Sequence, residues 1–180
     1  MRLDFLLLSI ALATAPAVGQ ACWHEAARTW GVPASLLYAI AKVESSLTPQ
    51  AVNRSHMQRS GSYDIGLMQI NSSHLPVLAR YGIRESDLFD ACTNLQVGAW
   101  LLAHNFARWG HSWEAIGAYN ASCTQLKGAA CRKARSSYAW RVYQHLPKST
   151  RALFAGQSPA QSQSPWSHGG AMAPIAQVSP

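Results

Sequence analysis

The chain has 180 residues, of which 48% are hydrophobic and 13% are charged, so it has room for one domain with a single core. Its formal net charge is +7, from 15 basic and 8 acidic residues. A basic face of this kind suits an anionic polymer or an anionic membrane surface. The chain carries no nucleic-acid recognition motif, so we expect no nucleic-acid partner.

The N-terminus is typical of a secretory signal. Arg2 precedes an apolar run from Phe5 to Ala13, and small residues follow that suit cleavage after Gly19 or Ala21. The apolar run is too short for a comfortable membrane span. We therefore assign residues 1–21 to a signal peptide and expect a periplasmic protein. Lipidation at the next residue, a cysteine, is the poorer alternative because no Leu stands three residues before it.

Two helices are predicted at the start of the mature chain. The first runs from about Cys22 to Trp30 and is stopped by Gly31. Pro33 suits the first turn of the second. Apolar residues then recur at helical spacing and give this second helix one buried face: Leu36, Leu37, Ile40 and Val43. Glu44 therefore lies near the C-terminal end of that helix.

The middle of the chain is more polar. Residues 48–64 are rich in Asn, Ser and Gly, which indicates a long loop or a small hairpin and not a helix. Asn71 and the two serines after it suit the cap of another helix, which we expect to run to Tyr81 and to end at Gly82.

Three further helices are predicted before the composition changes. The longest, about Asn94 to Trp109, is apolar on most sides and should be the core helix. Shorter helices are expected at Trp113–Tyr119 and at about Ser136–His145.

Beyond Ala155 the chain consists mainly of Gln, Ser, Pro, Ala and Gly and loses its charge, which is typical of disorder. We therefore divide the mature chain into a folded domain, 22–150, and a disordered C-terminal tail, 151–180.

Four cysteines remain after removal of the signal. An even number in an exported chain predicts disulfides, and four cysteines allow three pairings. We favour Cys123–Cys131, which closes a short loop, and Cys22–Cys92, which joins the starts of two elements. A metal site is the weaker alternative because the chain has no CxxC or HExxH motif and its seven histidines are scattered. We expect no metal and no other cofactor.

Three short segments occur in a fixed order: Glu44–Ser45 at a helix end, Gly66–Ile70 (Gly-Leu-Met-Gln-Ile) and Ala118–Ala121 (Ala-Tyr-Asn-Ala). Together they resemble the catalytic domain of soluble lytic transglycosylases, relatives of goose-type lysozyme. The likeness runs from about Cys22 to Leu146. It implies a mainly α, lysozyme-like single domain of the α+β lysozyme superfold.

Two more segments narrow this resemblance. Ala79–Ile83 and Trp113–Gly117 are similar to the small, specialised members that accompany type III and type IV secretion, conjugation and pilus systems. The partners that the resemblance implies are peptidoglycan glycan strands and components of such an apparatus. The implied task is local opening of the cell wall during assembly.

Cleavage of a glycosidic bond requires an acid that still holds its proton near neutral pH, and hence a partly desolvated carboxyl. Glu44 suits this by its place at a helix end beside core residues, although most lone glutamates at such ends are simply exposed. The resemblance implies that Glu44 is the catalytic acid. In this mechanism Glu44 first donates its proton to the oxygen between N-acetylmuramic acid and N-acetylglucosamine. As a carboxylate it then takes a proton from the C6 hydroxyl of N-acetylmuramic acid, and a 1,6-anhydro ring forms without water.

We also predict a set of substrate-binding residues: Ser45, Met68, Gln69, Tyr119 and Asn120, which the resemblance implies, and Asp64, which lies beside them in the sequence. The amides of Gln69 and Asn120 offer donors and acceptors to N-acetyl groups or to Glu44. Tyr119 is expected to hold the catalytic carboxyl or to fill core, and Met68 to pack beneath the site.

Asp64 departs from the pattern, because many members have Ser two residues before the glycine of Gly-Leu-Met-Gln. A second acid could orient water and make the enzyme a hydrolytic muramidase of the same fold, or it could be a turn residue without chemistry. A non-catalytic peptidoglycan-binding assembly subunit is the remaining alternative. Glu44 argues against it, since binding alone needs no acid there.

Overall fold

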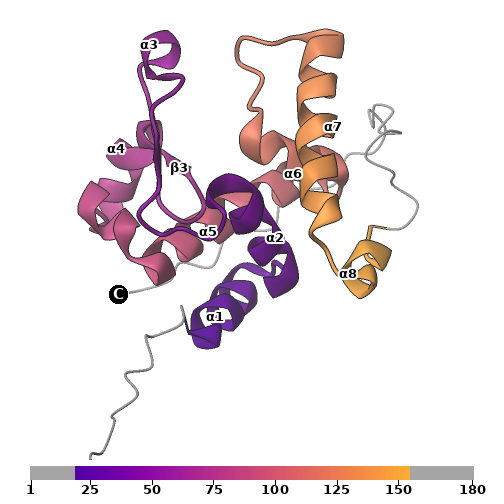
Figure 1. The fold of residues 1–180 in the computed structure, drawn as a ribbon, viewed down its shortest axis with the longest axis horizontal. Coiled ribbons are helices and arrows are strands. Elements are labelled where there is room, and N and C mark those ends of the chain that lie inside the picture. The colour runs from indigo at the N-terminus through magenta and orange to yellow at the C-terminus, as the bar shows by residue number, and fades with distance from the viewer. Residues whose placement is uncertain (1–18, 155–180) are drawn as a thin grey trace, which may run out of the picture.

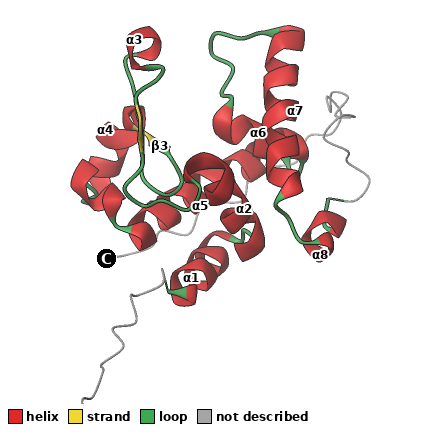
Figure 2. Ribbon diagram, viewed as in Figure 1, coloured by secondary structure: helices red, strands yellow, loops and turns green. Residues whose placement is uncertain are grey.

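Helices dominate the chain, as Figures 1 and 2 show, which confirms the predicted fold class. A computed structural model describes residues 19–154, so most of the predicted signal peptide and residues 155–180 of the predicted tail lie outside it. The α-helices are α1 (Gln20–Trp30), α2 (Ala34–Ser45), α3 (Met57–Ser60), α4 (Leu75–Leu78), α5 (Ala91–Trp109), α6 (Trp113–Asn120), α7 (Gly128–Gln144) and α8 (Lys148–Ala152).

Short strands and 3₁₀ turns fill the interval between α2 and α5. The elements are β1 (Val52–Asn53), β2 (Asp64–Ile65), β3 (Ile70–Asn71), η1 (Ser72–His74), η2 (Ala79–Tyr81) and η3 (Glu85–Phe89). The strands form an antiparallel sheet in the order β1-β2-β3, with Ile65 opposite Val52 and Ile70. The hairpin alternative for residues 48–64 is therefore correct, but the exclusion of a helix is wrong, because the one-turn helix α3 lies between β1 and β2.

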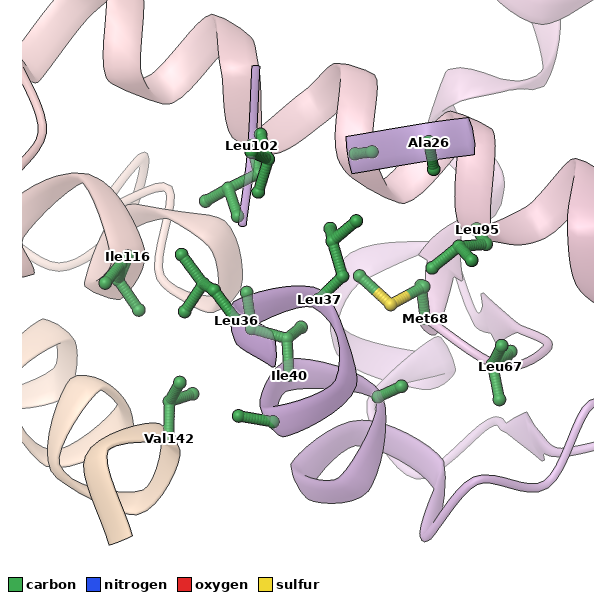
Figure 3. Packing of buried hydrophobic residues seen from close by; sticks show 14 of the residues in the cluster. Ala26, Leu36, Leu37, Ile40, Leu67, Met68, Leu95, Leu102, Ile116 and Val142 are labelled. Atoms are coloured by element: carbon green, nitrogen blue, oxygen red, sulfur yellow. The ribbon is translucent and has the colours of Figure 1, made fainter. Parts of the chain in front are cut away.

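The hydrophobic core is built around α2. This helix packs against α1, α5 and α7. Its buried side chains Leu36, Leu37 and Ile40 lie in Figure 3 among side chains from the other elements, including Met68, Leu95, Leu102, Ile116 and Val142. Burial of a Leu or Ile side chain stabilises a fold by roughly 1.5–3 kcal/mol. The same helix that carries Glu44 is thus fixed by the core.

Helix ends follow local chemistry. Gly31 ends α1 with φ 65°, as predicted. Ser46 ends α2 in the left-handed region with φ 53°, and Leu47 follows with φ 66°. The amide of Leu47 donates to the carbonyl of Ala41, which closes the last turn. This closure leaves Glu44 in the last turn of α2, where the sequence places it.

Several predicted boundaries are wrong. The helix expected before Gly82 is divided into η1, α4 and η2, with Pro76 in the first turn of α4, where its missing N–H removes no helical hydrogen bond. The helix α5 begins earlier, because the Asp90 side chain accepts from the amide of Thr93. The helix α7 begins at Gly128, since its Ala- and Arg-rich first half favours helix without an apolar pattern.

The boundary between domain and tail also moves. Arg151 lies in α8, and the Phe154 side chain is buried against the Trp113 ring with 4.9 Å between ring centroids. Residues 151–154 therefore belong to the folded part. Both predicted disulfides are present, with Cα–Cα distances of 5.4 Å for Cys22–Cys92 and 5.5 Å for Cys123–Cys131.

Across residues 19–154, no helix has the length and apolarity to cross a bilayer.

Gly66 lies where the backbone packs too closely for a side chain. Gly66 has φ 77°, and a Cβ there would overlap the Asn94 amide and the Leu88 carbonyl. Gly61 has a similar φ of 71° but open space around it. We expect Gly61→Ala to lower the free energy of unfolding by about 1 kcal/mol, the cost of a left-handed alanine.

Gly66→Ala should cost about 2 kcal/mol more than Gly61→Ala, because overlap adds to the same backbone penalty. Urea unfolding of both variants measures the difference. Equal costs for the two substitutions would contradict the packing described here.

Candidate active site

Glu44 is held by a tyrosine from a distant part of the chain. The Tyr138 hydroxyl on α7 donates to Oε1 of Glu44 at 2.5 Å, and its side chain is only 1% exposed. Arg141, one turn further along α7, lies with its guanidinium 5.4 Å from the centre of the Tyr138 ring. In Figure 1, α3 and the strands lie on one side of α2, and α6 and α7 lie on the other. The carboxyl of Glu44 is thus fixed at the junction of α2 and α7.

The surroundings of Glu44 keep it protonated far above the ordinary range. Its pKa is raised from 4.5 to about 7 by four effects together: burial, the largest, raises the pKa, the hydrogen bond from Tyr138 lowers it, the charge of Asp64 raises it and that of Arg141 lowers it. Desolvation penalises the carboxylate form, and the negative charge of Asp64 acts in the same direction. With a pKa of about 7, the carboxyl is present in both its protonated and its ionised form at neutral pH, so it can both give and take a proton.

A turn formed by Gly66–Ile70 is tied to three helices. The Ser45 hydroxyl on α2 donates to the Leu67 carbonyl at 2.7 Å. The Tyr119 hydroxyl on α6 donates to the Met68 carbonyl at 3.0 Å.

The third tie comes from α5. The amide of Met68 donates to Oδ1 of Asn94 at 2.7 Å, and Nδ2 of Asn94 donates to the carbonyls of Ile65 and Leu88. The Asn94 side chain is fully buried, so each of these bonds satisfies a polar group that water does not reach. The position of the Gly66–Ile70 turn relative to Glu44 is therefore set by buried hydrogen bonds.

Met68 and Gln69 serve the turn itself. The Met68 side chain is completely buried against Gly98, so it supports the site from beneath and does not reach a ligand. Gln69 has a left-handed φ of 50°, and its Nε2 donates to the carbonyls of Gly66 and Ala51 at 2.8 and 3.2 Å. Its amide hydrogens are thus engaged within the protein, where the sequence predicted donation to substrate or to Glu44.

Asp64 lies on β2 within a polar cluster. Its Oδ1 accepts from Nδ2 of Asn71 at 2.8 Å, and its Oδ2 lies 3.5 Å from Nδ2 of Asn53 and 3.6 Å from Nε2 of His56. The carboxylate contributes to the raised pKa of Glu44, which places the two acids within electrostatic range of each other.

Tyr119 and Asn120 end α6 near the same acids. Burial, and then the charges of Glu44 and Asp64, raise the pKa of Tyr119 well above its usual value. Its hydroxyl holds the Met68 carbonyl and not the Glu44 carboxyl, so the predicted contact is made by Tyr138 instead. Asn120 is the last residue of α6 and is exposed.

Sequence reasoning did not assign Tyr138, Asn94 or Arg141 to the site. Tyr138 and Val142 lie one turn apart on the buried face of α7, a spacing that marks that face in the sequence. That spacing shows which residues point inward but not which acid they meet.

No group of three or more His, Cys, Asp or Glu side chains in residues 19–154 is arranged to hold a metal ion.

Comparison with known proteins identifies the family. A family model described as the transglycosylase SLT domain matches residues 21–140. The chain belongs to this transglycosylase SLT domain family. The prediction of a lytic transglycosylase is thereby confirmed at the level of the family.

Relatives occur in Salmonella, Shigella and Escherichia coli. Invasion protein IagB of Salmonella typhimurium (strain SL1344) is 42% identical over 126 residues, which cover 69% of this chain and 76% of IagB. Protein IpgF of Shigella flexneri is 38% identical over 144 residues, covering 79% of this chain and 88% of IpgF. The X polypeptide of Escherichia coli is 38% identical over 130 residues, which cover 71% of this chain and 75% of the X polypeptide.

A solved structure has the same fold. It is that of an inactive mutant of the lytic transglycosylase Slt from Pseudomonas aeruginosa, with a TM-score of 0.56 and 22% identity. The match covers 80% of this chain but 26% of that longer one. The predicted lysozyme-like fold is confirmed by this likeness.

The raised pKa of Glu44 predicts how stability depends on pH. The folded state favours the protonated carboxyl, so its stabilisation is fully present below pH 4.5 and is lost as pH rises through about 7. Glu44→Gln removes this dependence. As the pH rises from 4.5 to 8, the wild type loses this stabilisation and the variant does not. The free energy of unfolding of the variant, relative to that of the wild type, should therefore increase by about 3 kcal/mol over this range.

Urea unfolding across this pH range measures the gain, and Glu25→Gln, which removes an exposed carboxyl on α1, is the matched control. The same pH-dependent gain in both variants, or none in Glu44→Gln, would sink the assignment.

Tyr138→Phe tests the hydrogen bond to Glu44. Its loss removes the contact that lowers the pKa of Glu44, so the alkaline limb of the activity profile should move to higher pH. Tyr143→Phe removes a hydroxyl from the same helix without touching Glu44 and should leave the limb in place. A pH–rate profile on peptidoglycan is the measurement, and an unmoved limb in Tyr138→Phe would contradict the contact's role.

Proposed function

We propose that the chain cleaves the β-1,4 bond between N-acetylmuramic acid and N-acetylglucosamine in peptidoglycan by intramolecular transglycosylation. The observation that carries this is the Glu44 carboxyl, which is partly withdrawn from water, bonded to Tyr138 and shifted to a pKa of about 7. Glu44 gives its proton to the bridging oxygen as the C1–O bond breaks. The resulting carboxylate takes the proton of the C6 hydroxyl as that oxygen bonds to C1, and a 1,6-anhydro ring is the product.

This reaction needs only one carboxyl, and Glu44 can supply it. A conventional glycosidase uses two carboxylates, one of which activates water or attacks the sugar. Here the proton that leaves Glu44 returns to it from the substrate itself, so the atoms balance without water. The buried hydrogen bonds that hold the Gly66–Ile70 turn fix one wall beside Glu44.

Asp64 favours a second candidate, a hydrolytic muramidase. Its carboxylate acts electrostatically on Glu44 and keeps one edge toward His56. A carboxylate in that place would orient water for attack at C1. The two candidates differ in product: anhydro ends for the transglycosylase and reducing ends for the muramidase.

The setting we propose is the periplasm, during assembly of a secretion or conjugation apparatus. Two disulfides support an oxidising compartment. The similarity to a protein named for invasion supports a link to an apparatus of that kind. The predicted signal peptide fits the same setting.

Product analysis of digested sacculi by mass spectrometry tests the reaction. The wild type should release 1,6-anhydro ends, and Glu44→Gln should lose roughly a hundred- to ten-thousand-fold in rate. Asp64→Asn should still form anhydro ends, because the proposed reaction needs no second acid. Normal clearing by folded Glu44→Gln would disprove its role. Reducing ends that vanish in Asp64→Asn would establish the muramidase instead.

A further inference from the structure

An open pocket of about 340 Å³ lies where the end of α5, the helix α6 and the first half of α7 meet. It is separate from the Glu44 carboxyl and from the Gly66–Ile70 turn. The charged side chains that line it are four cations and one carboxylate: Arg108, Lys127, Arg132, Arg135 and Glu114.

The charge of the pocket is largely uncompensated. Arg135 is 6% exposed and is paired with Glu114 at 2.6 Å, so these two side chains neutralise each other. Arg108, Lys127 and Arg132 are exposed, and none of them forms a salt bridge within the part of the chain that the structure describes. The pocket therefore offers a positive surface to an anion.

The walls of the pocket are preformed. Nε of Arg135 donates to the Ala121 carbonyl at 2.9 Å, and Nη2 donates to the Ser122 carbonyl at 3.4 Å. The Cys123–Cys131 disulfide then ties the same loop to α7, and Nζ of Lys127 donates to the Cys123 carbonyl. A wall fixed in this way loses little conformational freedom when a ligand binds.

One side of the pocket is apolar. The Trp109 ring lies against the guanidinium groups of Arg108 and Arg135, at 5.0 and 4.9 Å from the ring centre. Leu126 is 47% exposed. A ligand that carries carboxylates on short alkyl chains would satisfy both the cations and these apolar side chains.

The pocket lies near Tyr138, the residue that bonds Glu44, because Arg135 and Tyr138 are on the same helix. Arg135 and Tyr138 are three residues apart on α7, about 4.5 Å along the helix axis. On α6, Gly117 approaches Arg135 so closely that a Cβ would lie 2.6 Å from its side chain, and the pocket loop begins directly after Asn120. Figure 1 shows this loop joining the ends of α6 and α7.

We propose that this pocket binds free carboxylates of the peptide stem that N-acetylmuramic acid carries, and so selects strands with intact stems. The proposal rests on the proposed function, since it takes peptidoglycan as the substrate. A stem of four residues spans up to about 13 Å when extended, enough to reach from a sugar beside Glu44 along one or two turns of α7. The stem's alkyl chains would lie on Trp109 and Leu126.

The test compares short glycan strands of equal length with stems intact and with stems removed by an amidase. The ratio of kcat/KM on the two substrates should exceed one for the wild type. In Arg108→Glu and in Arg132→Glu this ratio should fall by at least about threefold, because a charge reversal turns attraction of the carboxylates into repulsion. The difference in this ratio between the wild type and the two variants should become smaller in high salt, which screens the charges. Arg80→Glu, an exposed reversal on η2, is the matched control and should keep the wild-type ratio.

An unchanged ratio in both pocket variants would overturn the proposal, as would an equal fall in Arg80→Glu. A wild-type ratio near one would overturn it as well, since the pocket then serves another anion. The products separate this failure from failure of the proposed function. Anhydro ends from the wild type with no stem effect remove only the pocket's role, whereas their absence removes the transglycosylase itself.

Discussion

The candidate site depends on one carboxyl that is withdrawn from water and still hydrogen-bonded. Glu44 is placed in the last turn of a helix whose other face is the centre of the core, and Tyr138 meets it from α7. Burial raises its pKa more than the hydrogen bond lowers it, which yields a group that gives and regains a proton near neutral pH. The packing of α2 against α1, α5 and α7 offsets the unfavourable free energy of burying this carboxyl.

The rest of the site consists of supports for this arrangement. Asn94 shows the principle most clearly, because one buried amide satisfies an N–H and two carbonyls around the Gly66–Ile70 turn. Ser45 and Tyr119 bind neighbouring carbonyls of the same turn from other helices. The segments that resemble the family are thus connected to one another by hydrogen bonds.

Sequence reasoning predicted the helix that carries Glu44 from its apolar spacing, and it predicted both disulfides. The family resemblance, and not local spacing, singled out Glu44 on that helix. Sequence reasoning did not find Tyr138 as the partner of Glu44, since 94 residues separate them and no local pattern encodes that contact. It gave Gln69 an outward role, although a left-handed backbone turns its amide toward the protein. It also ended the domain before Phe154, whose burial depends on the distant Trp113 ring.

The most direct test of the central claim is the pKa of the Glu44 carboxyl, measured by NMR titration of protein labelled with carbon-13 at the glutamate side chains. Glu44→Gln assigns the signal by removing it. We predict a midpoint of about 7 for Glu44, well above its ordinary value of 4.5. A midpoint near the ordinary value of 4.5 would show a solvated carboxylate, and a single acid that protonates the leaving oxygen at neutral pH would then be contradicted.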